Sequence, residues 1–130
     1  MMQRHARNII TVFLLSLVAP AAVFAQSKPR TEEDFYPMTR VPIPEDINLE
    51  AGGLELMPDG QLAIGTRRGD IYMLANPFAD DTSKMKFTLW ARGLHEILGL
   101  AKRDGWLYVT QRPEVTRARD EDGDGRADVF

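Results

Sequence analysis

Beyond residue 45, hydrophobic and polar positions alternate with the short period of β-strands rather than the longer period of helices. Short runs of this kind predict strands at 53–57, 61–66, 71–74, 99–101, 106–110 and 115–117. Turn residues separate the runs, as in Pro58-Asp59-Gly60 and Asp104-Gly105, because Gly supplies positive φ and Pro presets the turn. The best helix candidate, 93–102, is interrupted by Gly99 and is better interpreted as a loop followed by a strand. We therefore expect an all-β body over residues 46–130.

The strand-and-turn pattern repeats at a nearly constant offset. Three pairs of residues carry the repeat: Gly60 and Gly105, Leu62 and Leu107 (both 45 apart), and, after one gap, Leu54 and Leu100. A period of this length built from short strands is typical of β-propeller blades, and a small β-sandwich with coincidental spacing is the alternative. Propellers close with about four to eight blades, whereas this body has room for about two. The sequence thus predicts the first one to two blades of an incomplete β-propeller, from a longer protein or a truncated gene product.

The first 25 residues have the three-part pattern of a secretory signal peptide. Two arginines precede an apolar run over 9–18, and Val23 and Ala25 fit the small-residue positions before a cleavage site. A membrane anchor is the alternative, but the run is shorter than the ~20 residues that span a bilayer. We expect residues 1–25 to be removed, no membrane span after cleavage, and a periplasmic or secreted protein.

Residues 26–45 form a polar lead-in with four prolines, which exclude a helix or a central strand. Phe35, Tyr36 and Met38 are apolar enough for part of this segment to lie along the domain surface.

Charge and composition exclude several classes of function. Loss of the two arginines of the signal peptide leaves 14 basic against 19 acidic residues, a net charge of −5. An acidic chain without a basic stripe disfavours nucleic acid and anionic membrane surfaces as partners. The chain has no cysteine, so disulfides, covalent c-type haem, Cys-ligated zinc and a Cys nucleophile are excluded.

The acidic segment 120–128 has the ligand spacing of an EF-hand-type calcium loop. Side-chain oxygens at positions 1, 3, 5 and 9 and a backbone carbonyl at position 7 fall on Asp120, Asp122, Asp124, Asp128 and Arg126, respectively. Gly125 takes position 6, where the loop turns sharply. The twelfth ligand would be residue 131, and no helical pattern precedes the loop, so we expect weak binding, ~10⁻⁴–10⁻³ M. A solvated acidic turn shaped by glycines is the alternative.

Other candidates carry less chemistry. His95 is the only histidine after residue 25, and a general base or a structural role are both open. Arg68-Gly69-Asp70 spells a cell-adhesion tripeptide, but its place between two strands favours a hairpin turn. Four aromatic residues at strand positions are expected in the core or between blades: Tyr72, Trp90, Trp106 and Tyr108.

Several segments together resemble the glucose/sorbosone dehydrogenase-like β-propellers, in particular the exported branch common in planctomycetes and related bacteria. The segments are 52–60, 66–71, 93–101 and 107–128, and the resemblance covers nearly all of 41–130. It is most specific in Gly93-Leu94-His95-Glu96 to Ala101 and in the acidic loop.

The resemblance implies a six-bladed propeller whose catalytic members bind pyrroloquinoline quinone (PQQ) and calcium and oxidise sugars. In those members the base histidine and most quinone contacts lie in later blades, and His95 matches an early loop instead. No catalytic or quinone-binding residue is therefore assigned to this chain, and the electron acceptor stays open. The alternative function is a non-catalytic, calcium-stabilised propeller module that binds carbohydrate or protein.

Overall fold

A computed structural model describes residues 28–130, so the predicted signal peptide lies outside the described residues. The chain divides into two units, one ending at Pro37 and the other spanning Met38–Phe130. The described part of the first unit holds one exposed turn of 3-10 helix, η1 (Glu32–Asp34). Among the described residues, no helix has the length and apolarity needed to cross a membrane.

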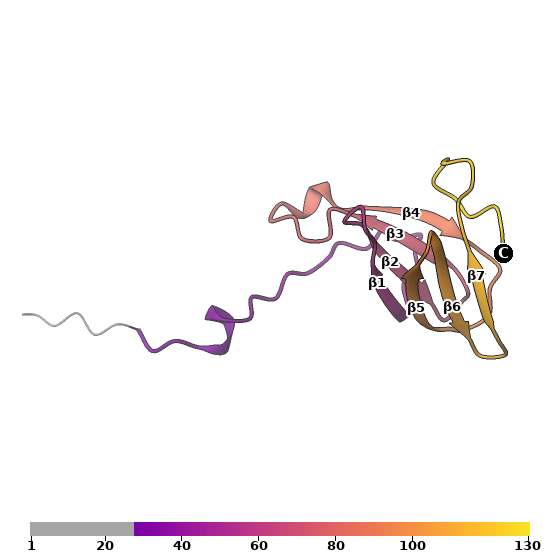
Figure 1. The fold of residues 1–130 in the computed structure, drawn as a ribbon. Coiled ribbons are helices and arrows are strands. Elements are labelled where there is room, and N and C mark those ends of the chain that lie inside the picture. Colours follow the sequence, from indigo (N-terminus) through magenta and orange to yellow (C-terminus); the bar gives the residue numbers. More distant parts are fainter. Residues whose placement is uncertain (1–27) are drawn as a thin grey trace, which may run out of the picture. The chain divides into compact units, whose positions relative to one another are not determined.

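Seven strands form the body of the second unit, and they make two antiparallel sheets (Figure 1). Sheet A has the order β1-β2-β3-β4. Its strands are β1 (Ala51–Leu56), β2 (Leu62–Thr66), β3 (Ile71–Ala75) and β4 (Lys86–Ala91), with a short 3-10 turn, η2 (Thr82–Lys84), before β4. Sheet B has the order β5-β6-β7, formed by β5 (Ile97–Arg103), β6 (Trp106–Gln111) and β7 (Val115–Ala118).

The all-β prediction is confirmed, and all six predicted strands are present with shifted ends. The segment 93–102 is a loop followed by β5, as the glycine in its middle indicated. The sequence analysis did not identify β4. Within residues 38–130 the two sheets do not close into a ring or barrel.

The 45-residue offset relates equivalent places in the two sheets. Gly60 and Gly105 occupy the β1–β2 and β5–β6 turns with φ of 84° and 81°, a left-handed conformation that favours glycine. Thr66 and Gln111, also 45 apart, end β2 and β6 and are the two buried polar residues of the body. The sequence repeat therefore corresponds to a repeated three-strand unit.

The sheets pack face to face, and the core lies between them. It is formed by buried residues of sheet A (Ala63, Ile71, Met73, Trp90, Ala91) and of sheet B (Ile97, Leu107, Val109, Ala118). Strands β1 and β5 contact each other along this junction. Glycines allow the close approach: a Cβ on Gly53 would meet the backbone of Gly99, and one on Gly65 would meet the Ile97 side chain.

The other aromatic residues lie outside this core. Tyr72 is buried on the opposite face of sheet A, where it lies beside its cross-strand partners Ile64 and Leu89. Trp106 and Tyr108 are half-buried on the outer face of sheet B. The guanidinium groups of Arg117 and Arg119 lie over the Trp106 ring, 4.2 Å and 4.5 Å from its centroid. In such cation–π contacts the ring quadrupole attracts the cation to the ring face.

A second apolar cluster covers the outer face of sheet A. Ile64, Leu74 and Met85 are buried there, and Val41 and Leu49 pack against them. The segment before β1 thus lies along the domain surface through these residues, whereas Phe35, Tyr36 and Met38 are exposed.

Candidate metal site

The acidic loop is anchored at both ends to the two sheets. Arg119 and Val129 form an antiparallel bridge, with Arg119 N donating to Val129 O (3.0 Å) and Val129 N donating to Arg119 O (3.2 Å). Ala127 N donates to Trp90 O of β4 (2.8 Å), and Ala127 packs against the core. The loop therefore belongs to the folded body, and it is the yellow excursion after β7 in Figure 1.

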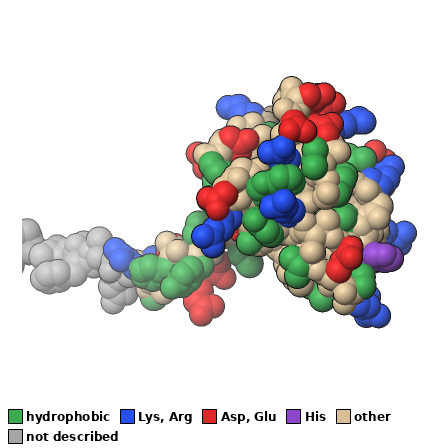
Figure 2. All heavy atoms as spheres, turned by 45° about the vertical axis from the view of Figure 1, so that its right-hand side comes forward, with side chains coloured by type: hydrophobic (Ala, Val, Ile, Leu, Met, Phe, Trp, Pro, Cys, Tyr) green, Lys and Arg blue, Asp and Glu red, His purple; other side chains and the backbone are tan. Residues whose placement is uncertain are grey.

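Three carboxylates converge inside this loop. Ligand oxygens of Asp120, Asp122 and Asp124 all lie within 4.8 Å of one another. Calcium binds oxygens at about 2.3–2.6 Å, so two ligands on opposite sides of the ion are about 5 Å apart. The three oxygens therefore fit within one coordination sphere. Acidic side chains gather at the upper end of the body in Figure 2, where the loop lies in Figure 1.

Backbone amides inside the loop hold these side chains in place. Asp120 accepts from the amides of Gly123 (2.7 Å) and Gly125 (2.9 Å) through its two carboxylate oxygens. Asp122 accepts from Asp124 N (3.1 Å), and Asp124 accepts from Arg126 N (2.8 Å). Both glycines have positive φ, which turns their amides inward. These bonds leave further lone pairs on each carboxylate for a cation.

The other two predicted ligands have different roles in the described structure. The Asp128 carboxylate accepts from the amides of Glu121 (2.9 Å) and Asp122 (3.4 Å), so it closes the loop behind the three converging aspartates. Arg126 contributes its amide to Asp124, while its carbonyl was the predicted ligand. The structure thus brings together Asp120, Asp122 and Asp124, and the calcium assignment stays a prediction for the whole set.

The remaining sequence candidates lie at the opposite ends of the strands. His95 is exposed, and its amide donates to the Gln111 side chain. Arg68-Gly69-Asp70 forms the β2–β3 turn; Leu94 N donates to Gly69 O (3.1 Å), and Asp70 pairs with Arg92 (3.1 Å). The tripeptide is therefore packed against the loop that follows β4. Burial, followed by the nearby Asp70 carboxylate, raises the pKa of the Tyr72 hydroxyl above its ordinary value.

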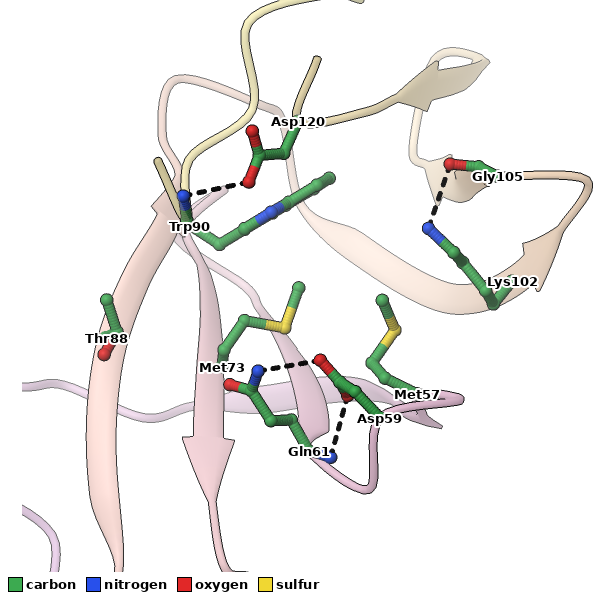
Figure 3. A pocket seen from close by; sticks show the side chains of 10 residues that line it. Met57, Asp59, Gln61, Met73, Thr88, Trp90, Lys102, Gly105 and Asp120 are labelled. Atoms are coloured by element: carbon green, nitrogen blue, oxygen red, sulfur yellow. Dashed lines mark hydrogen bonds between the residues drawn. The ribbon is translucent and has the colours of Figure 1, made fainter. Parts of the chain in front are cut away.

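A hollow of about 330 Å³ adjoins the acidic loop between the sheets (Figure 3). We call it the inter-sheet hollow. Its lining residues are Met57, Asp59, Gln61, Met73, Thr88, Trp90, Lys102, Gly105, Asp120 and Gly125. Sequence analysis did not identify it, because its lining combines strands β3 and β4 with three hairpin ends that only the packing of the sheets brings together.

Comparisons of the chain with protein-family models, with curated proteins and with solved structures find no match.

Proposed function

We propose that the loop 120–128 binds calcium and that the two sheets are neighbouring blades of an exported β-propeller of the glucose/sorbosone dehydrogenase type. The observation that carries the calcium assignment is the convergence of the Asp120, Asp122 and Asp124 oxygens within 4.8 Å. Three carboxylates this close repel one another, and a hard divalent cation relieves that repulsion. An extracytoplasmic location suits weak binding, because extracellular calcium modules work in the ~10⁻⁴–10⁻³ M range.

Three features support the propeller assignment. Sheet A has four antiparallel strands in sequential order, as a propeller blade does. Sheet B repeats the first three strands at the same offset and packs its face on sheet A, with β1 and β5 adjacent. Outer faces of both sheets carry apolar or aromatic side chains, including Leu54, Leu56 and Trp106, which further blades would cover.

The family resemblance supplies the proposed reaction, which is the PQQ-dependent oxidation of a sugar hydroxyl by the complete propeller. We assign no described residue to the quinone or to the base that takes the proton. Reading the gene beyond codon 130 tests this part of the proposal. Further repeats of similar length would support it, and an immediate stop codon would contradict a dehydrogenase role for this chain.

Isothermal titration calorimetry on the full chain tests the calcium loop. We expect saturable binding with a dissociation constant of ~10⁻⁴–10⁻³ M, lost in the double variant Asp122→Asn/Asp124→Asn. The matched control is Asp46→Asn/Asp80→Asn, which removes the same charge from two exposed positions outside the loop. Equal binding by both double variants, or no binding by the wild type at millimolar calcium, would contradict the assignment.

The second candidate function is a non-catalytic module that binds carbohydrate or protein. The inter-sheet hollow favours it, because the hollow is formed entirely within residues 57–125 and needs no further blade.

A further inference from the structure

Asp-Gly pairs occur at four places in the turns and loops of the body, at 59–60, 104–105, 122–123 and 124–125. In such a pair the backbone amide nitrogen of the glycine can attack the side-chain carboxyl of the aspartate, because glycine has no Cβ to hinder the approach. The reaction needs an amide nitrogen that is free to attack and a carboxyl group that is free to meet it. The hydrogen bonds of these two groups therefore rank the four pairs.

The pair in the β1–β2 turn has both groups engaged. Gly60 N donates to Met57 O (2.9 Å). The Asp59 carboxylate accepts from Gln61 N (3.0 Å) through one oxygen and from Gln61 Nε2 (2.9 Å) through the other. Attack by Gly60 N on Asp59 would require several of these bonds to break.

The two pairs in the acidic loop are engaged in the same way. Gly123 N and Gly125 N both donate to Asp120, at 2.7 Å and 2.9 Å. The carboxylates of Asp122 and Asp124 each accept from the backbone amide two residues further along the chain, at 3.1 Å and 2.8 Å. Asp120 thus holds away both amide nitrogens that could attack a carboxyl group in this loop.

The fourth pair, in the β5–β6 turn, is held more loosely. Within residues 28–130 the Gly105 amide makes no hydrogen bond, and the Asp104 side chain, which is 81% exposed, has one contact, with Arg103 Nε at 3.3 Å. A Cβ on Gly105 would meet nothing within 4 Å, so the tip of the turn can move without displacing packed atoms. Asp104 also has a φ of 49°, in the left-handed region that a Cβ disfavours.

We propose that Asp104 is the site at which the folded chain forms a succinimide and then isoaspartate. The Gly105 nitrogen bonds to Asp104 Cγ, and the hydroxyl of the protonated carboxyl group leaves with the amide proton as water. Water then opens the ring at one of its two carbonyl carbons. Cleavage of the bond from Cγ to nitrogen restores aspartate, and cleavage of the bond from the backbone carbonyl carbon to nitrogen gives isoaspartate. Water is the only other reactant.

The modification lengthens the main chain of the turn, because isoaspartate routes the backbone through its side chain. Arg103 and Trp106 pair directly across this two-residue turn, and Lys102 Nζ donates to Gly105 O (3.0 Å). Both contacts depend on the length of the turn, so we expect the modified chain to have a less stable sheet B. The inference goes beyond the proposed function and requires neither calcium nor further blades.

Peptide mapping of the aged full chain tests the proposal. The protein is incubated for several weeks at neutral pH with a chelator, digested, and analysed by mass spectrometry with fragmentation that distinguishes isoaspartate from aspartate. We expect isoaspartate to form about tenfold faster at residue 104 than at 59, 122 or 124, because each hydrogen bond that must break is worth about a two- to tenfold factor. In urea, which removes these bonds, the four pairs should react at similar rates.

Three variants separate the turn from the other pairs. Asp104→Glu keeps the charge but has a side chain one carbon longer, which closes the ring much more slowly, so isoaspartate at 104 should disappear. The matched change Asp59→Glu should leave the reaction at 104 unaltered. Asp120→Ala frees the Gly123 and Gly125 amides, and we expect isoaspartate at 122 and 124 to form about two- to tenfold faster in the folded chain.

The proposal is overturned if isoaspartate accumulates first at 59, 122 or 124, or if all four pairs react equally in the folded chain. It is also overturned if residue 104 reacts in urea but not in the folded protein. Unchanged rates at 122 and 124 in Asp120→Ala would show that hydrogen bonding of the amides does not rank the pairs, and would contradict the reasoning that selects Asp104.

Discussion

The two sheets approach closely where Gly53 and Gly99 face each other, and this contact gives the sharpest prediction for stability. Gly53 on β1 and Gly99 on β5 both lack the positive φ that strains other residues, so alanine is conformationally allowed at either position. A Cβ on Gly53 would lie 2.9 Å from Gly99 Cα and 3.1 Å from its carbonyl carbon. Carbon atoms in contact are normally about 3.5–4.0 Å apart. Because the opposing atoms are backbone, no change of side-chain rotamer relieves the clash.

A Cβ on Gly99 points elsewhere, and its nearest neighbour would be Thr110 Cβ at 3.9 Å. The two substitutions Gly53→Ala and Gly99→Ala therefore add the same methyl group to facing residues with opposite expected results. Overpacking typically costs about 1–3 kcal/mol. Gly→Ala offsets about 0.4–1 kcal/mol of this by restricting the unfolded chain. We expect a net loss of about 1–2 kcal/mol for Gly53→Ala and a small gain for Gly99→Ala.

Thermal unfolding followed by circular dichroism measures the difference. At about 4–8 °C per kcal/mol for a domain of this size, Gly53→Ala should lower Tm by about 4–16 °C, while Gly99→Ala raises it slightly. If Gly53→Ala has the same Tm as the wild type, or if both variants lose the same stability, the two sheets do not approach each other closely at this point.

Three further predictions concern an ion-pair cluster, a buried tyrosine and an exposed edge strand. Glu96 pairs with Arg67 (3.1 Å) and Arg112 (2.9 Å), linking the ends of β2 and β6; Glu96→Gln should cost less than about 1 kcal/mol in a urea melt, and a loss that persists in 1 M salt, where the Debye length is ~3 Å, would argue against the ion pairs. Burial raises the pKa of Tyr72, so its contribution to stability is present below the ordinary tyrosine pKa and is lost as pH rises toward the folded value. Tyr72→Phe should therefore show a shallower loss of stability at alkaline pH, and an unchanged profile would refute the shift. Leu54 and Leu56 are exposed on the edge strand β1, so we expect the chain to self-associate through this apolar strand. Replacing both with Lys should reduce that association in sedimentation velocity, and an unchanged distribution would contradict the prediction.

Local turn chemistry made most of the strands predictable. Gly60, Gly69 and Gly105 each have positive φ in a hairpin turn, and each ends a run that the sequence pattern identified as a strand. The missed strand, β4, follows the segment 76–85, in which Asn76 at φ 53° and the Asp81 cap of η2 replace the usual glycine turn. A strand that no glycine turn precedes is hard to distinguish from a loop by residue propensity alone.

The candidate metal site shows the same limit at the level of side chains. Spacing alone predicted that Asp120, Asp122 and Asp124 converge, because alternate side chains in a tight loop can point to the same side. Spacing could not determine the role of Asp128, whose carboxylate bonds to the amides of Glu121 and Asp122. The hollow was beyond sequence reasoning for another reason: Thr88 and Lys102 meet only because β4 and β5 belong to different sheets that pack together.

The acidic loop 120–128 and the segment 76–85 occupy equivalent positions after the two sheets' third strands. Ala75 pairs with Lys86 around the excursion 76–85, and Arg119 pairs with Val129 around 120–128. In each case the excursion follows the third strand of a sheet, and the paired residues at its base carry the strand geometry. The connection after the third strand can therefore change in sequence without altering the sheet beneath it. Grafting 120–128 in place of 76–85 is therefore a route to a second acidic loop on the same scaffold.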